Sequence, residues 1–130
     1  MNEKMNKIFS YGTLDRTRFF SDLFRAGEIR YVGKGKIRAK LYDLGEYPGA
    51  VEDKESYVHG RVYEVKNIER VLPMFDEYEE FHPNKPETSL FIRKDIWVTM
   101  ENGESLRAFV YLYNKAVERK KAIPTGIWDK

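Results

Sequence analysis

The chain of 130 residues contains no cysteine and only two histidines, His59 and His82, which lie on separate segments. The absence of cysteine excludes disulfides, thiolate nucleophiles and cysteine-based zinc sites. The two histidines are not at metal-ligand spacing, so we expect neither a metal site nor another cofactor. A Ser/His/Asp triad would have to use one of them without a supporting motif, and the sequence has no Gly-x-Ser-x-Gly nucleophile elbow.

The sequence also lacks an excess of charge of either sign and any long apolar run. Lys and Arg total 23 against 21 Asp and Glu, a formal net charge of +2. A duplex-binding protein usually concentrates cations on one face, so we expect no nucleic-acid partner. No stretch is long enough to span a bilayer, and the polar segment from Met1 to Lys7 lacks the apolar run of a signal peptide. We therefore predict a cytoplasmic protein without a membrane partner. Its oligomeric state stays open.

The apolar residues suffice for a single core. Hydrophobic residues make up 42% of the chain and charged residues 34%, which predicts one domain that covers residues 1–130. Runs typical of strands occur at residues 8–9, 29–44, 58–65, 90–100 and 106–112. Asn102-Gly103 between the last two runs predicts a hairpin, and Gly60 inside the third predicts a bulge or a close backbone approach.

Two segments have the spacing of helices. Apolar residues between Phe19 and Phe24 predict a helix that Asp15 caps at its start and Gly27 ends. A second helix is expected to begin near Pro73, after a short turn, and to reach Glu79. The tail from residue 115 looks irregular, and four of its residues can pack against the domain: Ile123, Pro124, Ile127 and Trp128. About six strands, mostly antiparallel, with two or three short helices argue for an α+β sheet or a small barrel.

Glu79 is the candidate for acid–base chemistry. Leu72, Phe75 and Glu79 share one helical face at i, i+3 and i+7, which turns Glu79 toward the core. Burial disfavours the charged carboxylate and raises its pKa toward the range useful for proton transfer at neutral pH. The alternative is an ordinary carboxylate at a frayed helix end.

The segment Ser10-Tyr11-Gly12-Thr13-Leu14 is the candidate for binding. A strand that ends in a glycine turn before a helix can leave several N–H groups unpaired. Such donors suit a carboxylate or a developing oxyanion. A purely structural turn is the alternative.

Together these residues resemble the γ-glutamylcyclotransferase-like family, also called AIG2-like. Tyr11-Gly12-Thr13-Leu14 is similar to the family's Tyr-Gly-Ser/Thr-Leu loop, and Tyr47-Pro48-Gly49 to its Tyr/Phe-Pro-Gly turn. The strand from Val58 to Val65 fits its Gly-x-Val/Leu-Tyr-x-Val pattern, and Phe75 to Glu79 its Leu-Asp-x-Tyr/Phe-Glu signature. Arg93 and the strand from Ala108 to Tyr111 also fit.

The resemblance implies a compact β-barrel with a few helices. It also implies release of 5-oxoproline and a free amine from a small γ-glutamyl substrate. It assigns the acid/base role to Glu79 and substrate binding to Tyr11, Gly12, Thr13 and Leu14. Two departures concern the pocket: the family's glycine after the glutamate is Glu80 here, and Phe91 stands where members often have tyrosine.

Three alternatives remain open. The same pocket can serve a different γ-glutamyl reaction, such as removal of a γ-glutamyl protecting group during biosynthesis. The fold can also act as a binding module without catalysis. Nucleic-acid binding through the basic strand near Lys36 is the least favoured, because the net charge is close to balance.

Overall fold

A computed structural model describes residues 5–130, which contain six β-strands, two α-helices and two short 3₁₀ helices. The strands are β1 (Lys7–Ser10), β2 (Ile29–Asp43), β3 (Pro48–Val65), β4 (Phe91–Met100), β5 (Ser105–Tyr113) and β6 (Lys121–Ala122). The helices are η1 (Leu14–Arg16), α1 (Arg18–Arg25), α2 (Ile68–Tyr78) and η2 (Pro86–Thr88).

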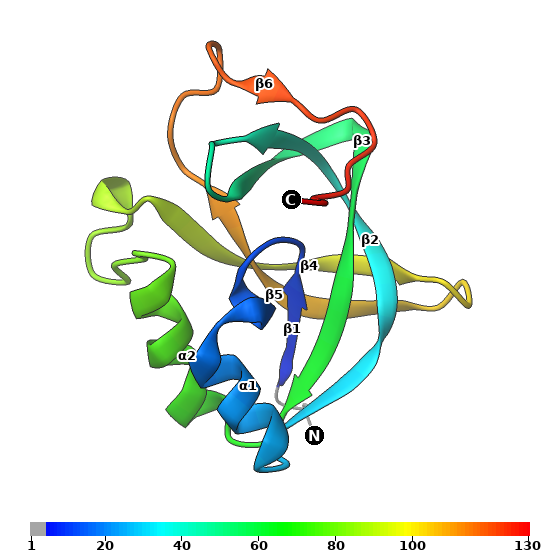
Figure 1. The fold of residues 1–130 in the computed structure, drawn as a ribbon, viewed down its shortest axis with the longest axis vertical. Helices are drawn as coiled ribbons and strands as arrows, with labels where there is room; N and C mark the ends of the chain where they lie inside the picture. The colour runs from blue at the N-terminus through cyan, green and yellow to red at the C-terminus, as the bar shows by residue number, and fades with distance from the viewer. Residues whose placement is uncertain (1–4) are drawn as a thin grey trace.

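Five of the strands close into a barrel. They are hydrogen-bonded in the order β3-β1-β5-β4-β2, and a further pairing between β2 and β3 completes the circle, while β6 adds to β2. Among the strands of residues 5–130, all pairings are antiparallel except that of β1 with β5. In Figure 1, β2 and β3 are the long curved strands that bend around the barrel. The predicted α+β class and small, mainly antiparallel barrel are confirmed.

Alternation along β1 divides the apolar side chains into two layers. Phe9 belongs to the cluster that fills the barrel, whereas Ile8 belongs to the cluster that includes residues of α1 and α2. Successive strand side chains point to opposite faces, so the helices cover the outer wall of the barrel beside β1. Figure 1 shows both helices on that side. The loop that follows β1 therefore runs between the barrel and the helical layer.

The start of α1 differs from the prediction, and its end agrees. Thr17 caps the helix, because its side-chain oxygen accepts a hydrogen bond from the N–H of Phe20. The predicted cap, Asp15, lies within η1 and accepts a hydrogen bond from the Tyr63 hydroxyl at 2.8 Å. At the other end, Gly27 has a φ of 77° and terminates the helix as predicted. An extra turn of 3₁₀ helix thus moved the true cap two residues along the chain.

The prediction that the second helix begins near Pro73 is wrong. Helix α2 is continuous from Ile68 to Tyr78, with Pro73 inside it. A proline in a helix interior costs about 3 kcal/mol because it removes a hydrogen bond and crowds the preceding turn. Pro73 lies on the exposed side, while Val71 and Phe75 beside it are fully buried. Their packing against the barrel offsets the cost and keeps the helix intact.

The predicted hairpin is confirmed, and the tail is partly as expected. Strands β4 and β5 pair along their length, and Gly103 adopts a φ of 88° in the turn between them. In the tail, Trp128 belongs to the barrel cluster and Ile123 packs against it, but Ile127 is half exposed and does not. The tail is also not wholly irregular, because β6 lies within it. The N–H of His59 donates to the carbonyl of Gly126, which holds the tail against β3.

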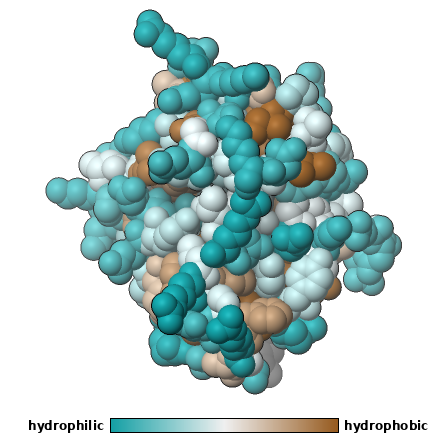
Figure 2. Space-filling model, viewed as in Figure 1, coloured by the Kyte–Doolittle hydropathy of each residue, from teal (hydrophilic) through white to brown (hydrophobic). Residues whose placement is uncertain are grey.

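The visible surface is mainly polar. In the view of Figure 2, hydrophilic side chains cover most of the face, and the apolar patches are small and separate. Within residues 5–130, no helix combines the length and apolar character needed to cross a membrane.

Candidate functional site

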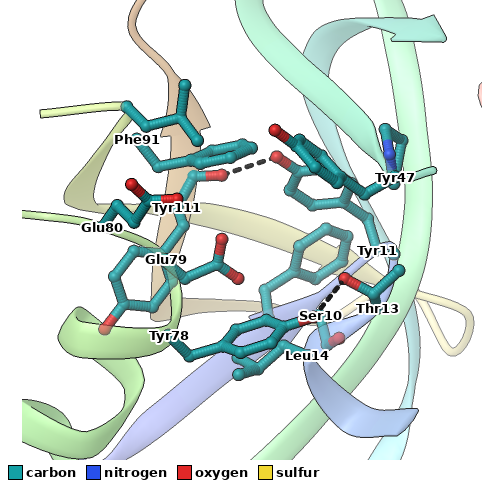
Figure 3. A pocket seen from close by; sticks show the side chains of 14 residues that line it. Ser10, Tyr11, Thr13, Leu14, Tyr47, Tyr78, Glu79, Glu80, Phe91 and Tyr111 are labelled. Atoms are coloured by element: carbon teal, nitrogen blue, oxygen red, sulfur yellow. Dashed lines mark hydrogen bonds between the residues drawn. The ribbon is translucent and has the colours of Figure 1, made fainter. Parts of the chain in front are cut away.

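A cavity of about 250 Å³ lies where the loop after β1 meets the end of α2. Its lining residues come from β1 and its loop, the start of β3, the end of α2, the start of β4, and β5. They are Phe9, Ser10, Tyr11, Gly12, Thr13, Leu14, Tyr47, Pro48, Tyr78, Glu79, Glu80, Leu90, Phe91 and Tyr111. All five residues predicted for the site are among them, and Figure 3 shows how their side chains surround the space.

Glu79 ends α2 and directs its carboxylate into the cavity. Its backbone N–H still donates to the carbonyl of Phe75, which fixes the residue at the last helical turn. Figure 3 shows the carboxylate pointing away from the helix, into the cavity. Burial raises its pKa from 4.5 to about 8. No hydrogen bond or ion pair from residues 5–130 reaches this carboxylate, so no neighbour offsets the cost of burying its charge.

The Tyr11 hydroxyl holds the loop in place. It donates to the carbonyl of Tyr111 at 2.6 Å and accepts from the N–H of Ala50 at 3.1 Å. Burial, with a further contribution from the charge of Glu79, raises the pKa of Tyr11 above its usual value. Because both contacts are to the backbone, the ring ties the loop to β5 and β3. What Tyr11 offers the cavity is therefore its ring and main chain.

Gly12 and Thr13 bring the loop close to its neighbours. A Cβ atom at Gly12 would lie 2.6 Å from Cγ of Pro48, so only glycine allows this approach. The Thr13 hydroxyl lies 2.8 Å from the Tyr78 hydroxyl, which joins the loop to the residue before Glu79. Figure 3 shows this bond across the cavity wall.

The amide groups of the loop face no protein acceptor. Among residues 5–130, the N–H groups of Gly12, Thr13 and Leu14 donate no hydrogen bond. Leu14 is itself buried and starts η1, which explains why its N–H has no intrahelical partner. Unpaired amide donors beside a cavity can hold an anion or a developing oxyanion.

A partly buried ion pair between Arg93 and Asp76 supports α2. Both carboxylate oxygens of Asp76 accept from Arg93, and the Tyr111 hydroxyl donates to Asp76 at 2.6 Å. Burial by itself would lower the pKa of Arg93, but the hydrogen bond and charge of Asp76 outweigh it and raise that pKa. Asp76 therefore accepts hydrogen bonds that fix the final turn of α2 to β4 and β5.

The residue after Glu79 has an unusual backbone. Glu80 has a φ of 55°, the only positive φ of a non-glycine residue among those the structure describes. It occupies the left-handed position of a Schellman motif, because the N–H of Phe81 donates to the carbonyl of Asp76 and that of Glu80 to Glu77. Helix α1 ends in the same motif with Gly27 at this position. The departure from glycine noted in the sequence thus falls where glycine is most favourable.

Sequence reasoning missed several lining residues. Ser10 was part of the predicted segment but not of the predicted binding set, and its hydroxyl is the only buried side-chain polar atom without a partner in residues 5–130. Tyr78 matched the family signature but was given no role in the site, and Leu90 gave no local signal for one. The ring centroid of Phe91 lies 6.0 Å from that of Tyr47. At this position the cavity wall is therefore an apolar ring, without the hydroxyl of the tyrosine that family members often have.

The described residues contain no group of three His, Asp or Glu side chains that could hold a metal ion. The charged and polar groups of the cavity are instead those of its carboxylates, hydroxyls and loop amides. This set can transfer protons and bind an anion.

Comparison with known proteins identifies relatives whose similarity to this protein covers nearly the whole chain. A family model described as gamma-glutamyl cyclotransferase, AIG2-like, matches residues 8–130. A Vibrio cholerae protein that carries the provisional name gamma-glutamylcyclotransferase is 31% identical over 121 residues, which cover 93% of each chain.

Solved structures show the same fold. The protein ytfP of Escherichia coli is 29% identical with a TM-score of 0.66, covering 94% of this chain and 95% of its own. An aig2-like protein of the mouse is 24% identical with a TM-score of 0.71, covering 98% of this chain and 90% of its own. At that identity the mouse protein is evidence of the fold alone.

Proposed function

The chain belongs to the AIG2-like gamma-glutamyl cyclotransferase family, and on that premise we propose that it releases 5-oxoproline and a free amine from a γ-glutamyl amine or γ-glutamyl-amino acid. The observation that carries the proposal is the position of the Glu79 carboxylate, with its raised pKa, in the cavity that Gly12, Thr13 and Leu14 also line, three residues whose N–H groups donate no hydrogen bond within residues 5–130.

The reaction needs no nucleophile from the protein. The substrate's own α-amine attacks its γ-carbonyl carbon, a carbon–nitrogen bond closes the five-membered ring, and the bond to the leaving amine breaks. Holding both ends of the γ-glutamyl group in one cavity favours this geometry, because orientation can supply a large part of the barrier. The absence of cysteine from the chain is compatible with such chemistry.

Glu79 is proposed to move the proton. The α-amine is protonated in water and must lose a proton before it attacks, and the leaving amine must gain one. Glu79 accepts the first proton and delivers it to the leaving nitrogen. After the attack the ring nitrogen loses its second proton, which ends on the released amine as an ammonium, so the net proton count is unchanged. A carboxylate with a pKa of about 8 is suited to both steps, since general acids and bases work best when their pKa is near the working pH.

The loop from Tyr11 to Leu14 is proposed to bind the substrate's anionic or developing negative oxygen. Its free N–H groups are fixed by the packing of Gly12 on Pro48 and by the Tyr11 hydroxyl. Such fixed donors stabilise charge that develops in a transition state more than charge already present.

The proposal is tested by incubating the protein with γ-glutamyl-amino acids and with γ-glutamyl-ε-lysine and measuring 5-oxoproline. Glu79→Gln keeps the side-chain shape and removes the base, so we expect kcat/KM to fall by about 10²- to 10⁴-fold. Glu77→Gln, on the exposed side of the same helix, is the matched control and should retain activity. Unchanged turnover by a folded Glu79→Gln protein would refute the catalytic role.

The same assay separates a binding module from an enzyme. A γ-glutamyl compound that raises the melting temperature without yielding 5-oxoproline would favour the non-catalytic alternative.

A further inference from the structure

The cavity has charge of one sign only. Of the 14 residues that line it, the charged ones are Glu79 and Glu80, and no lysine, arginine or histidine is among them. The nearby cation Arg93 is held by Asp76 and does not line the cavity. Any positive charge that balances these carboxylates has to come from the ligand.

The acidic field extends to the side of the cavity formed by Tyr47. Burial is the main cause of the raised pKa of Tyr47, and the electrostatic effect of Tyr113 is the next. The charges of three carboxylates raise this pKa further: Glu80, Glu46 and Glu79. Glu46 does not line the cavity but precedes Tyr47 in the chain. The charges of these three glutamates thus act on this side of the cavity, which favours an approaching cation over an anion.

Burial distinguishes the two ends of the cavity. Ser10 is 5% exposed, and its hydroxyl has no partner in residues 5–130. It falls on the same face of β1 as Ile8, which is the face that meets the helices. A buried polar group without a partner calls for an explanation, and a bound polar ligand supplies one. The deep end is thus suited to the γ-glutamyl group, while exposed Glu80 lies toward solvent.

The Glu80 side chain is free to act on the ligand. No hydrogen bond or ion pair from residues 5–130 reaches its carboxylate. Its backbone, by contrast, is fixed on both sides, because the N–H donates to Glu77 and the carbonyl accepts from Leu90. A left-handed conformation disfavours glutamate relative to glycine. The chain therefore keeps an unpaired carboxylate at the rim, in a conformation that glycine would adopt more easily.

We propose that Glu80 selects γ-glutamyl substrates whose leaving amine carries a second positive charge, such as the mono-γ-glutamyl derivative of an aliphatic diamine. This inference rests on the proposed function. The γ-glutamyl group itself brings one ammonium and one carboxylate, which balance each other. A second ammonium on the leaving side is the charge that compensates Glu80. A leaving group with a carboxylate, as in γ-glutamyl-amino acids, brings the opposite charge to the same rim.

The test compares two substrates of equal length and shape. In γ-glutamyl-(4-aminobutyl)amide the chain ends in an ammonium, and in γ-glutamyl-pentylamide it ends in a methyl group. The ratio of their kcat/KM values isolates the terminal charge. We expect the natural protein to favour the charged substrate by about two- to fivefold, the effect of a solvent-exposed ion pair. The preference should shrink as salt is added.

Variants then assign the preference to one residue. Glu80→Gln removes the charge and should bring the ratio close to one, and Glu80→Gly, which also relieves the left-handed backbone, should do the same. Glu77→Gln removes a carboxylate of α2 that does not line the cavity and should leave the ratio as in the natural protein.

The outcomes are separable. Turnover of both substrates with the same ratio in the natural protein and in Glu80→Gln overturns the inference and leaves the proposed function intact. If the natural protein forms 5-oxoproline from γ-glutamyl-amino acids but from neither of these two amides, the inference is overturned and the proposed function stands. If it forms none from any of these compounds, both fail. A ratio near one in the natural protein also overturns the inference.

Discussion

Replacing Glu79 by Gln is expected to stabilise the folded protein, and to do so more strongly as the pH rises. In the unfolded chain the carboxyl has its ordinary pKa of 4.5, whereas in the cavity its pKa is about 8. Between these values the unfolded state has lost the proton and the folded state still holds it. Folded-state stability therefore falls as the pH rises from 4.5 to 8, and this loss is complete above pH 8.

The size of the effect follows from the same two values. A tenfold difference in proton affinity corresponds to about 1.4 kcal/mol, so the full difference is about 5 kcal/mol above pH 8 and about 3 kcal/mol at pH 7. The cavity is open to solvent, which screens the charge. We therefore expect Glu79→Gln to raise the free energy of unfolding by about 2 kcal/mol at pH 7 and to have little effect near pH 4.5.

Urea unfolding at several pH values measures this difference. Trp128 is buried in the barrel cluster, so its fluorescence should report the loss of tertiary structure. Glu77→Gln is the control, because Glu77 lies on the exposed side of α2 and its charge contacts water in both states. The reasoning is refuted if Glu79→Gln and the natural protein have the same stability at pH 5 and at pH 8.5.

Two further predictions concern activity and packing. First, kcat/KM for 5-oxoproline formation should rise as the pH increases through about 8. Glu79 must be ionised to accept a proton, and its pKa is about 8. The same pH dependence in Glu79→Gln would contradict this. Second, Gly12→Ala should destabilise the fold by about 1–3 kcal/mol, because its Cβ would lie 2.6 Å from Cγ of Pro48. Thermal unfolding checks this, and Pro48→Ala in the same chain should restore part of the loss.

The elements that the sequence predicted correctly are those with local signals. The Asn-Gly turn and the alternating strands on either side identify β4 and β5. Glycine at residue 27 identifies the end of α1. By contrast, the closure of the barrel depends on pairing between β2 and β3 along most of their length and on the parallel contact of β1 with β5. Non-local pairings leave no periodic pattern in a single strand, so no spacing rule could reveal them.

The candidate site was predictable in part for the same reason. Helical spacing predicted that Glu79 shares a face with the buried Phe75, and in the structure Glu79 follows the last residue of α2 and lines the cavity. The error at Pro73 came from weighing a local penalty without the packing energy of the neighbouring residues. Asp15 was proposed as a cap because the 3₁₀ turn before α1 has no distinct sequence signal.

The cavity wall that Tyr47 and Phe91 form could not be derived from the spacing of residues in the sequence. Tyr47 and Phe91 reach the cavity from distant segments, and only the resemblance to the family had singled them out. The role of the Tyr11 hydroxyl was also inaccessible, since its partners are backbone groups of β5 and β3. Side-chain direction at a loop depends on tertiary contacts that a sequence pattern does not contain.

The closure of β2 against β3 has a consequence for the behaviour of the protein at high concentration. Exposed strand edges present unpaired N–H and C=O groups to which other chains can add, and they are a common route to fibrous aggregates. Within residues 5–130, each of the five barrel strands has a neighbour on both sides. Along β2 and β3, edge-to-edge growth would first require the two strands to separate, whereas β4, in the part of the chain that the structure describes, pairs with β2 only through Thr99 and Met100 and keeps a longer free edge.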